Sequence, residues 1–199
     1  MRACWSHHAN SGHLVKTRAR QSYLYCNRLS DEPGGRASYE LDCPNGGLVV
    51  ALGNLLAQDP GNRNHTLLSF GAEGYHWPLN RLVLAHNTFA NRGPIGVFVR
   101  DHTGSAAALV ENNLFAGEGL FDGIALDATR GNLFAARADF IDPEGLDYRL
   151  SPRSALRERA VAVSRDQTLS LDPTDEYLHP LELRAIASNA PRSPGAFQS

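Results

Sequence analysis

Three cations at alternate positions of one short segment are the residues of this sequence best suited to chemistry. Lys16, Arg18 and Arg20 would share one face of an extended strand, and the smaller residues between them would share the other face. Lysine and arginine side chains in a row can hold carboxylates through charge-assisted hydrogen bonds. The segment therefore predicts a binding site for an acidic ligand.

Two acids follow about one repeat later in the chain. Glu40 and Asp42 share a strand face, and neighbouring strands of a stacked sheet lie roughly 4.8 Å apart. We therefore expect Lys16 to lie over Glu40 and Arg18 over Asp42. Such acids would orient the cations toward a bound sugar acid. The same pattern also fits a row of exposed ion pairs, which contributes little stability, and the sequence leaves both interpretations open.

A site of this kind could perform β-elimination in a uronic-acid chain. The reaction needs a neutralised sugar carboxylate, a base for the adjacent C–H proton and an acid for the leaving oxygen. A lysine crowded by arginines has its charged form disfavoured, so Lys16, between His13 and Arg18, is the candidate base. Tyr39 or His13 could act as the acid.

The sugar carboxylate would be neutralised by Arg18, by Arg20, or by a cation that Glu40 and Asp42 hold. The cation held by Glu40 and Asp42 could be Ca²⁺. We expect no other cofactor. The histidines near the N-terminus do not predict a metal site, because such a site needs convergent ligands with their own supporting partners.

An insertion at residues 71–78 carries two aromatic side chains. Tyr75 and Trp77 follow Glu73 within it. Aromatic rings offer broad flat faces on which sugar rings can stack, so these two residues could form a wall of the same groove. They could equally pack the insertion against the body of the protein.

The elements that must position these residues form a repeat. The motif Asn, any residue, then Leu or Phe recurs at intervals of 27, 33, 26 and 19 residues, starting at Asn27, Asn54, Asn87, Asn113 and Asn132. Recurrence of this length indicates stacked units. Asparagine at a tight corner tolerates left-handed backbone and bonds nearby backbone groups. We expect the amides to stack as a ladder, with the apolar residues two positions later inside: Leu29, Leu56, Phe89 and Phe115.

Two series of strand-like runs accompany this motif. One series precedes each asparagine, at Ser22–Cys26, Leu48–Leu52, Arg81–Ala85 and Ala106–Val110. The other lies further upstream, at Leu14–Arg18, Ser38–Asp42, Thr66–Phe70 and Ile95–Val99. Both series advance with a similar period, which describes coils and not hairpins. No window before residue 150 shows the sustained apolar spacing of a helix.

With these corners and coils, residues 12–142 resemble the pectin-lyase-like superfamily of right-handed parallel β-helix proteins. The segment around Lys16 loosely resembles the alginate and chondroitin lyases of polysaccharide lyase family six. In that branch a catalytic lysine lies nine residues before the corner asparagine, and a catalytic arginine lies in the next coil. Here Arg18 holds the first position, Lys16 lies two residues earlier, and the arginine of the next coil is missing.

The resemblance implies an all-β, single-stranded right-handed parallel β-helix of about four to five coils over residues 1–150. Residues 151–199 contain five prolines, and we expect them to form an irregular C-terminal cap over the open edge of the last coil. The first strand pattern starts near His13 and leaves little room for an N-terminal cap. We therefore expect the chain to be an N-terminally truncated member.

Composition narrows the function classes. With 19 Lys and Arg against 21 Asp and Glu, the formal net charge of −2 predicts no nucleic-acid partner. No apolar run reaches the roughly 18 residues of a membrane helix, and the first residues lack the apolar core of a secretory signal. Three cysteines are too few for a disulfide scaffold, and Cys26 is expected to be a buried thiol.

Taken together, these patterns predict a bacterial β-helix protein that processes extracellular polysaccharide. The enzyme hypothesis is a polysaccharide lyase, with a glycoside hydrolase as the weaker alternative. A non-catalytic β-helix for glycan binding or surface structure, or an inactive fragment, would have the same sequence features. We expect a monomer that binds acidic polysaccharide, with the full-length parent located outside the cell or in the periplasm.

Overall fold

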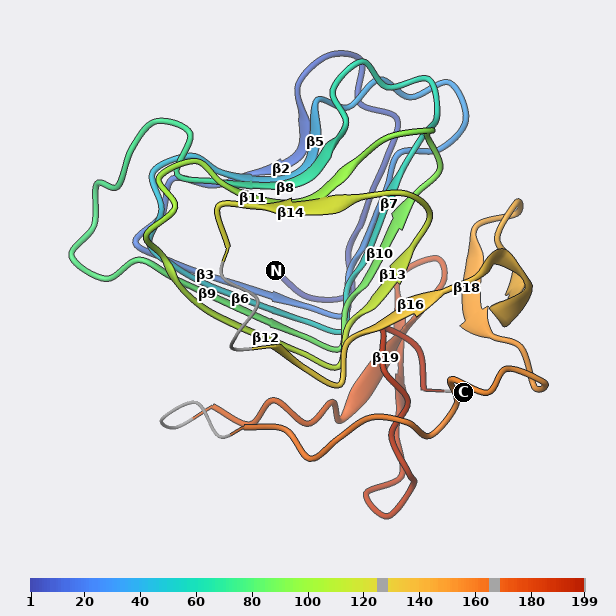
Figure 1. The fold of residues 1–199 in the computed structure, drawn as a ribbon. Coiled ribbons are helices and arrows are strands. Elements are labelled where there is room, and N and C mark those ends of the chain that lie inside the picture. The colour runs from blue at the N-terminus through green and yellow to red at the C-terminus, as the bar shows by residue number, and fades with distance from the viewer. Residues whose placement is uncertain (125–128, 165–168, 199) are drawn as a thin grey trace.

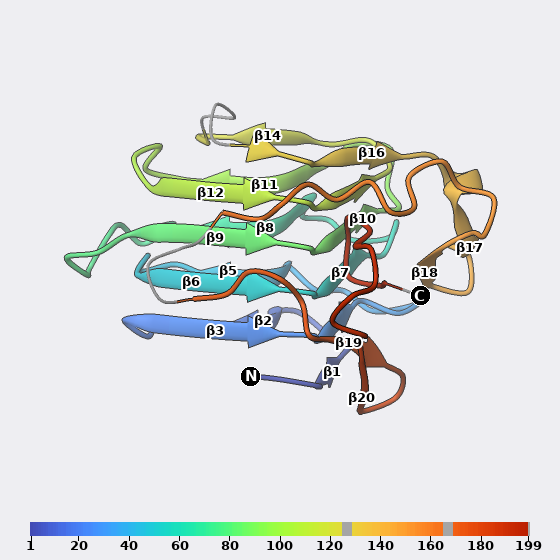
Figure 2. The ribbon, with the colours of Figure 1, turned by 90° about the horizontal axis from the view of Figure 1, so that it is seen from below.

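The computed structural model describes residues 1–124, 129–164 and 169–198. It is an all-β structure in which three parallel sheets surround one interior (Figure 1). Seen from the side, the coils stack one on another, from β3 at one end to β14 and β16 at the other (Figure 2). This arrangement agrees with a β-solenoid, as the repeat predicts.

Each sheet takes one strand from every coil and is named here by its first strand. The β2 sheet contains β2 (His13–Lys16), β5 (Tyr39–Cys43), β8 (Thr66–Phe70), β11 (Val97–Asp101) and β14 (Leu120–Asp122). The β3 sheet contains β3 (Gln21–Tyr25), β6 (Leu48–Leu52), β9 (Arg81–Ala85), β12 (Ala107–Glu111) and β15 (Thr129–Arg130). The β1 sheet contains β1 (Trp5–Ser6), β4 (Arg28–Ser30), β7 (Leu55–Gln58), β10 (Thr88–Asn91), β13 (Leu114–Ala116) and β16 (Leu133–Ala135).

Alternating side chains give these strands their inner face. The predicted inner column lies in register across the β1 sheet, where Leu29 pairs with Leu56, Leu56 with Phe89, and Phe89 with Phe115. All four residues are buried, and the rings of Phe89 and Phe115 stack with centroids 5.3 Å apart. Burial of this apolar column is the main force that holds the coils together.

The corner asparagines form the expected ladder. The Nδ2 of each donates to the Oδ1 of the next, at 2.8 Å from Asn27 to Asn54, 2.9 Å from Asn54 to Asn87 and 3.0 Å from Asn87 to Asn113. Asn113 continues to Asn132 at 2.9 Å. Each acceptor oxygen also takes a backbone N–H, so these buried amides leave few polar atoms unpaired.

The left-handed backbone at each corner belongs to the preceding residue and not to the asparagine itself. Cys26, Gly53, His86, Asn112 and Gly131 all have positive φ, between 49° and 69°. The expectation that the asparagine adopts this conformation is therefore wrong. The asparagine is needed for its amide, and the bend is made one residue earlier.

The C-terminal region lies along the sides of the solenoid. It contains a 3-10 turn, η2 (Arg137–Asp139), and two antiparallel hairpins, β17 (Phe140–Asp142) with β18 (Asp147–Leu150) and β19 (Asp175–Leu178) with β20 (Glu182–Ala185). It packs on the outer faces of the β1 and β3 sheets and returns to the first coil beside β1 (Figure 2). At the other end, Phe134 of the last coil is 65% exposed, so the expected cap over the last coil is absent from the described residues.

This packing determines the environment of two of the cysteines. Cys26 is buried, as expected, and its thiol donates to the Asp175 carbonyl at 3.2 Å. Burial raises the pKa of Cys26 to about 11 and also raises the pKa of Cys43. Both thiols are therefore protonated at neutral pH and poorly reactive.

Candidate functional site

A cluster of charged side chains lies on the outer face of the β2 sheet. Lys16 Nζ lies 2.9 Å from Asp42 Oδ2, and His13 Nε2 lies 3.5 Å from the same oxygen. Lys16 Nζ and His13 Nε2 are 3.4 Å apart. The Asp42 side chain is 2% exposed and the Lys16 side chain 32%. A buried acid therefore holds a lysine that still reaches solvent.

Strand register brings these residues together. In the parallel ladder between β2 and β5, His13 pairs with Tyr39 and Lys16 pairs with Asp42. The predicted alignment of Lys16 with Glu40 is therefore wrong by two residues. Alternate spacing determines which residues share a face, but not how far one strand slides along its neighbour.

Arg18 takes a partner from a distant loop instead of Asp42. Its Nε donates to Glu73 Oε2 at 2.7 Å and its Nη2 to Glu73 Oε1 at 2.5 Å. The same acid lies 3.9 Å from Lys16 Nζ. Both Arg18 and Glu73 are about half exposed, so Glu73 fixes the guanidinium at the surface without removing it from solvent.

Glu73 reaches this face because its loop is tied to the coil below. The loop between β8 and β9 bonds through backbone groups, from Glu73 N–H to the Pro44 carbonyl at 2.9 Å and from His76 N–H to the Asn45 carbonyl at 3.0 Å. Sequence reasoning noted an acid in this insertion but gave it no role. Its pairing with Arg18, 55 residues earlier, depends on the loop path, for which the sequence has no local signal.

Glu40 does not belong to the cluster. It is fully buried, and neither carboxylate oxygen has a hydrogen-bond partner within the described part of the chain. The flanking pairs of the ladder place it beside Leu14. Desolvation, with a smaller contribution from Asp31, raises its pKa well above the ordinary value. Burial therefore favours the neutral form of Glu40, and its position away from the cluster does not support the predicted cation site between Glu40 and Asp42.

His13 is a member of the cluster whose pKa departs from its ordinary value. Partial burial lowers its pKa, the nearby Lys16 and Arg18 lower it further, and Asp42 opposes them. His13 is therefore neutral at pH 7. Its ring stacks on Tyr39, with centroids 5.0 Å apart, which brings the two candidate acids to adjacent strands.

The remaining predicted site residues lie outside this cluster. Arg20 is exposed beyond the end of β2. The Tyr75 hydroxyl donates to Asp101 Oδ1 at 2.6 Å and its ring packs edge-on against Phe70. Burial and this bond raise the pKa of Tyr75 to about 12. Trp77 has a buried indole nitrogen. The two aromatics thus pack the insertion against the body, which favours the packing interpretation over the groove wall.

A polar row continues from the cluster across the outer face of the β2 sheet. Ladder pairs align Lys16 with Asp42, Asp42 with Ser69, Ser69 with Arg100, and Arg100 with Asp122. Arg100 Nε donates to Asp122 at 2.8 Å, and Ser69 shares a hydrogen bond with His102 at 3.2 Å. Sequence reasoning missed this row, although strand parity in the later coils carries a signal for it.

Comparisons with protein-family models, with curated proteins and with solved structures return no match to this chain. No helix among the described residues is long and apolar enough to cross a membrane. Within the same residues, no three His, Cys, Asp or Glu side chains gather in a way that could hold a metal ion. Functional argument therefore depends on the geometry of the cluster.

The cluster has unused hydrogen-bond donors. Arg18 uses Nε and Nη2 on Glu73, and its Nη1 has no partner among the described residues. Lys16 directs one bond to Asp42 and has two further N–H donors. A carboxylate approaching from solvent would meet these donors already oriented by fixed acids, which lowers the entropy that binding costs.

Proposed function

We propose that this chain is a right-handed parallel β-helix of the pectin-lyase-like type that binds acidic polysaccharide on the outer face of its β2 sheet. Stacked parallel coils and the asparagine ladder support the superfamily. The right hand has general support, since about 98% of parallel crossover connections are right-handed. Such a polymer is found outside the cytoplasm, which agrees with an extracellular or periplasmic parent.

The observation that carries the proposal is the anchoring of two solvent-reaching cations by acids from other segments. Asp42 comes from the next coil and Glu73 from a loop one coil further. Exposed ion pairs contribute little stability, so stability alone gives weak reason for a loop to reach back onto this face. Lys16 and Arg18 would bind the uronate carboxylate, and Arg100 and Asp122, whose side chains reach solvent at the far end of the polar row, would contact sugar hydroxyls further along the polymer.

We further propose that the bound chain is cleaved by β-elimination. Neutral His13 takes the proton from the carbon next to the carboxylate, and the electron pair of that C–H bond forms a carbon–carbon double bond. The bond to the glycosidic oxygen breaks, and the Tyr39 hydroxyl gives that oxygen a proton. We assign the base to His13 in place of Lys16; the ion pair between Lys16 and Asp42 supports this choice.

A screen against uronate polymers, monitoring the absorbance of newly formed unsaturated ends, tests the enzyme proposal. We expect activity in the chain or its full-length parent, with His13→Ala inactive but still binding. Arg149→Ala is a matched control, because Arg149 pairs with Asp147 on the distant β18 hairpin. If unsaturated ends form at the same rate in His13→Ala, the assignment of the base is wrong.

A non-catalytic glycan-binding β-helix is the second candidate. The observation that favours it is that both cations already have partners, so an ion-pair row without turnover would look the same. Binding of acidic polymer without new unsaturated ends would establish this function. Absence of both binding and cleavage in the folded protein would overturn both proposals and support a structural module.

A further inference from the structure

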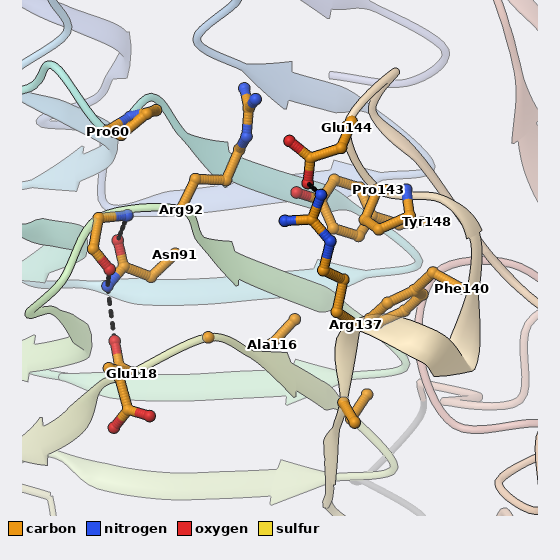
Figure 3. A pocket seen from close by; sticks show the side chains of 14 residues that line it. Pro60, Asn91, Arg92, Ala116, Glu118, Arg137, Phe140, Pro143, Glu144 and Tyr148 are labelled. Atoms are coloured by element: carbon orange, nitrogen blue, oxygen red, sulfur yellow. Dashed lines mark hydrogen bonds and ion pairs between the residues drawn. The ribbon is translucent and has the colours of Figure 1, made fainter.

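A cavity lies between the outer face of the β1 sheet and the β17–β18 hairpin (Figure 3). Its floor is apolar, made by Ala116 and Ala135 on the outer face of the sheet. Its far wall is the aromatic pair Phe140 and Tyr148, whose ring centroids are 5.2 Å apart in an edge-to-face arrangement. Arg92 forms the near wall. The cavity shares no residue with the His13, Lys16 and Arg18 cluster.

The Arg92 side chain makes no hydrogen bond with the residues that the structure describes. Its side chain is 18% exposed, and its one ion pair among the described residues is a long one, 3.8 Å to Asp59 Oδ2. The Nη1 atom is buried without a hydrogen-bond partner in the described structure. A guanidinium that is largely desolvated and poorly paired is costly. An anion in the cavity would remove that cost.

Tyr148 adds a free donor to the same space. Its residue is 3% exposed, and its hydroxyl makes no hydrogen bond with any other described residue. Burial raises its pKa to about 12, so it is a neutral donor at pH 7. The charges that act on the hydroxyl are Arg92, Arg28 and Arg137 against Glu144. The field around this hydroxyl is therefore positive and favours a negatively charged group.

The hairpin that walls the cavity is bonded to the solenoid, whereas the ion pair across the mouth of the cavity is exposed and can rearrange. The hairpin is tied to the solenoid by Arg28, whose Nη1 donates to the Leu146 carbonyl at 3.2 Å. Across the mouth, Arg137 pairs with Glu144, and both side chains are more than half exposed. Rearranging an exposed ion pair costs little. A ligand could thus enter without unfolding the hairpin, and Glu144 could then accept a bond from a ligand hydroxyl.

We propose that this cavity binds a single hexuronic acid residue, with its carboxylate on Arg92 and the Tyr148 hydroxyl and its apolar ring face on the alanine floor. The three requirements of that ligand are an anion site, an apolar face and a hydroxyl acceptor, and the cavity supplies each from a different side. The site is independent of the proposed function, because none of the residues that line the cavity belongs to the His13, Lys16 and Arg18 cluster.

Calorimetric titration with D-glucuronate tests the site, with D-glucose as the probe that lacks the carboxylate. We expect saturable binding of glucuronate with a dissociation constant of about 1 mM or tighter and no saturable binding of glucose. Arg92→Gln should weaken glucuronate at least about tenfold, because it removes the charge-assisted bonds. Tyr148→Phe, which keeps the ring, should weaken it severalfold. Lys16→Ala should have no effect on this titration.

A cavity-filling variant separates the site from general effects on folding. Ala116→Leu keeps every charge but occupies the floor, so it should abolish binding while the thermal unfolding midpoint confirms a folded chain. Equal binding of glucose and glucuronate, wild-type affinity in both Arg92→Gln and Ala116→Leu, or no saturable binding of glucuronate would each overturn the proposal.

Discussion

Lys16 and Asp42 form an ion pair in which the acid is buried and the base reaches solvent, with 2.9 Å between Nζ and Oδ2. The two residues lie in adjacent parallel strands at paired positions. A carboxylate with so little access to water depends on its protein partners to remain charged. Asp42 therefore fixes where Lys16 can point, and Lys16 is the part of the pair that a ligand can contact.

Replacing Glu40 should stabilise the protein at alkaline pH. Its pKa is raised in the folded state by burial, while the unfolded value is about 4.3. The stabilising contribution is therefore complete below about pH 4.3 and is lost as pH rises toward the raised folded value. Glu40→Gln should remove this loss, which denaturant unfolding across this pH range would measure.

Glu144→Gln is a control for this experiment, because Glu144 is an exposed acid at the tip of the β17–β18 hairpin. It should leave the pH dependence of the unfolding free energy almost unchanged. If Glu40→Gln is less stable than the wild type at high pH, the Glu40 carboxylate must form a stabilising contact in the folded protein that compensates for its burial.

His86 should make docking of the C-terminal tail sensitive to acid. Burial lowers its pKa to about 4, against about 6.5 in the unfolded chain. Its stabilising contribution is thus complete above about pH 6.5 and is lost as pH falls toward the folded value. One ring nitrogen shares a hydrogen bond with the Ser193 carbonyl at 3.1 Å. Protection from hydrogen exchange around residues 193–198, corrected for the intrinsic rate at each pH, should fall in acid more than protection in the strands.

A nuclear magnetic resonance titration of the histidine rings would measure the pKa of His86 directly. The His86 ring should titrate near pH 4, well below the ordinary histidine value of about 6.5. His86→Gln should remove the additional acid sensitivity of the tail. A His86 ring that titrates near the ordinary value would show that the tail does not cover it in solution.

Core packing should dominate the stability of the coils. Phe89→Ala should cost about 3 kcal/mol or more, since large aromatic truncations in a full core cost this much. Arg20→Ala should cost well under about 1 kcal/mol, because Arg20 is exposed. Comparable losses in the two variants, measured by denaturant unfolding, would mean that the inner and outer faces are assigned wrongly.

Sequence reasoning succeeded where structure depends on local spacing. The strands Leu48–Leu52, Thr66–Phe70 and Arg81–Ala85 have the predicted bounds, and the asparagine ladder joins all five predicted positions. Side chains alternate between the two faces of a strand, and the asparagine corner recurs once in each coil. Both patterns can therefore be recognised in the sequence alone. Parity also grouped Lys16 and Arg18 on the outer side of the coil.

Contacts that depend on the path of the chain were not predictable in this way. Glu40 and Asp42 have the same parity, but only Asp42 reaches the outer cluster, because the ladder between β2 and β5 has no regular pair at Glu40. Glu73 reaches Arg18 through a loop whose course is set by backbone bonds to the coil below. The cavity at Tyr148 likewise requires knowing where the C-terminal hairpin docks.

The last prediction concerns the outer cluster and its response to salt. If Lys16 and Arg18 bind a polyuronate, affinity should fall as ionic strength rises, because exposed charge pairs are screened over about 10 Å at 0.1 M salt. Asp42→Asn should weaken binding although it removes a negative charge, because Lys16 and His13 then lose the acid that orients them. Affinity electrophoresis in gels containing a polyuronate would measure both effects.

Glu182→Gln is the matched control, because it removes one exposed acid on the C-terminal β19–β20 hairpin, outside both proposed sites, and should strengthen or preserve binding through net charge alone. The two variants carry the same net charge, so any difference between them is due to position. If Asp42→Asn binds as tightly as Glu182→Gln, the cations act as a diffuse positive surface and not as an oriented site. Binding that weakens only in Asp42→Asn, and recovers at low salt, would show that orientation of Lys16 by a buried carboxylate is what makes this face a site.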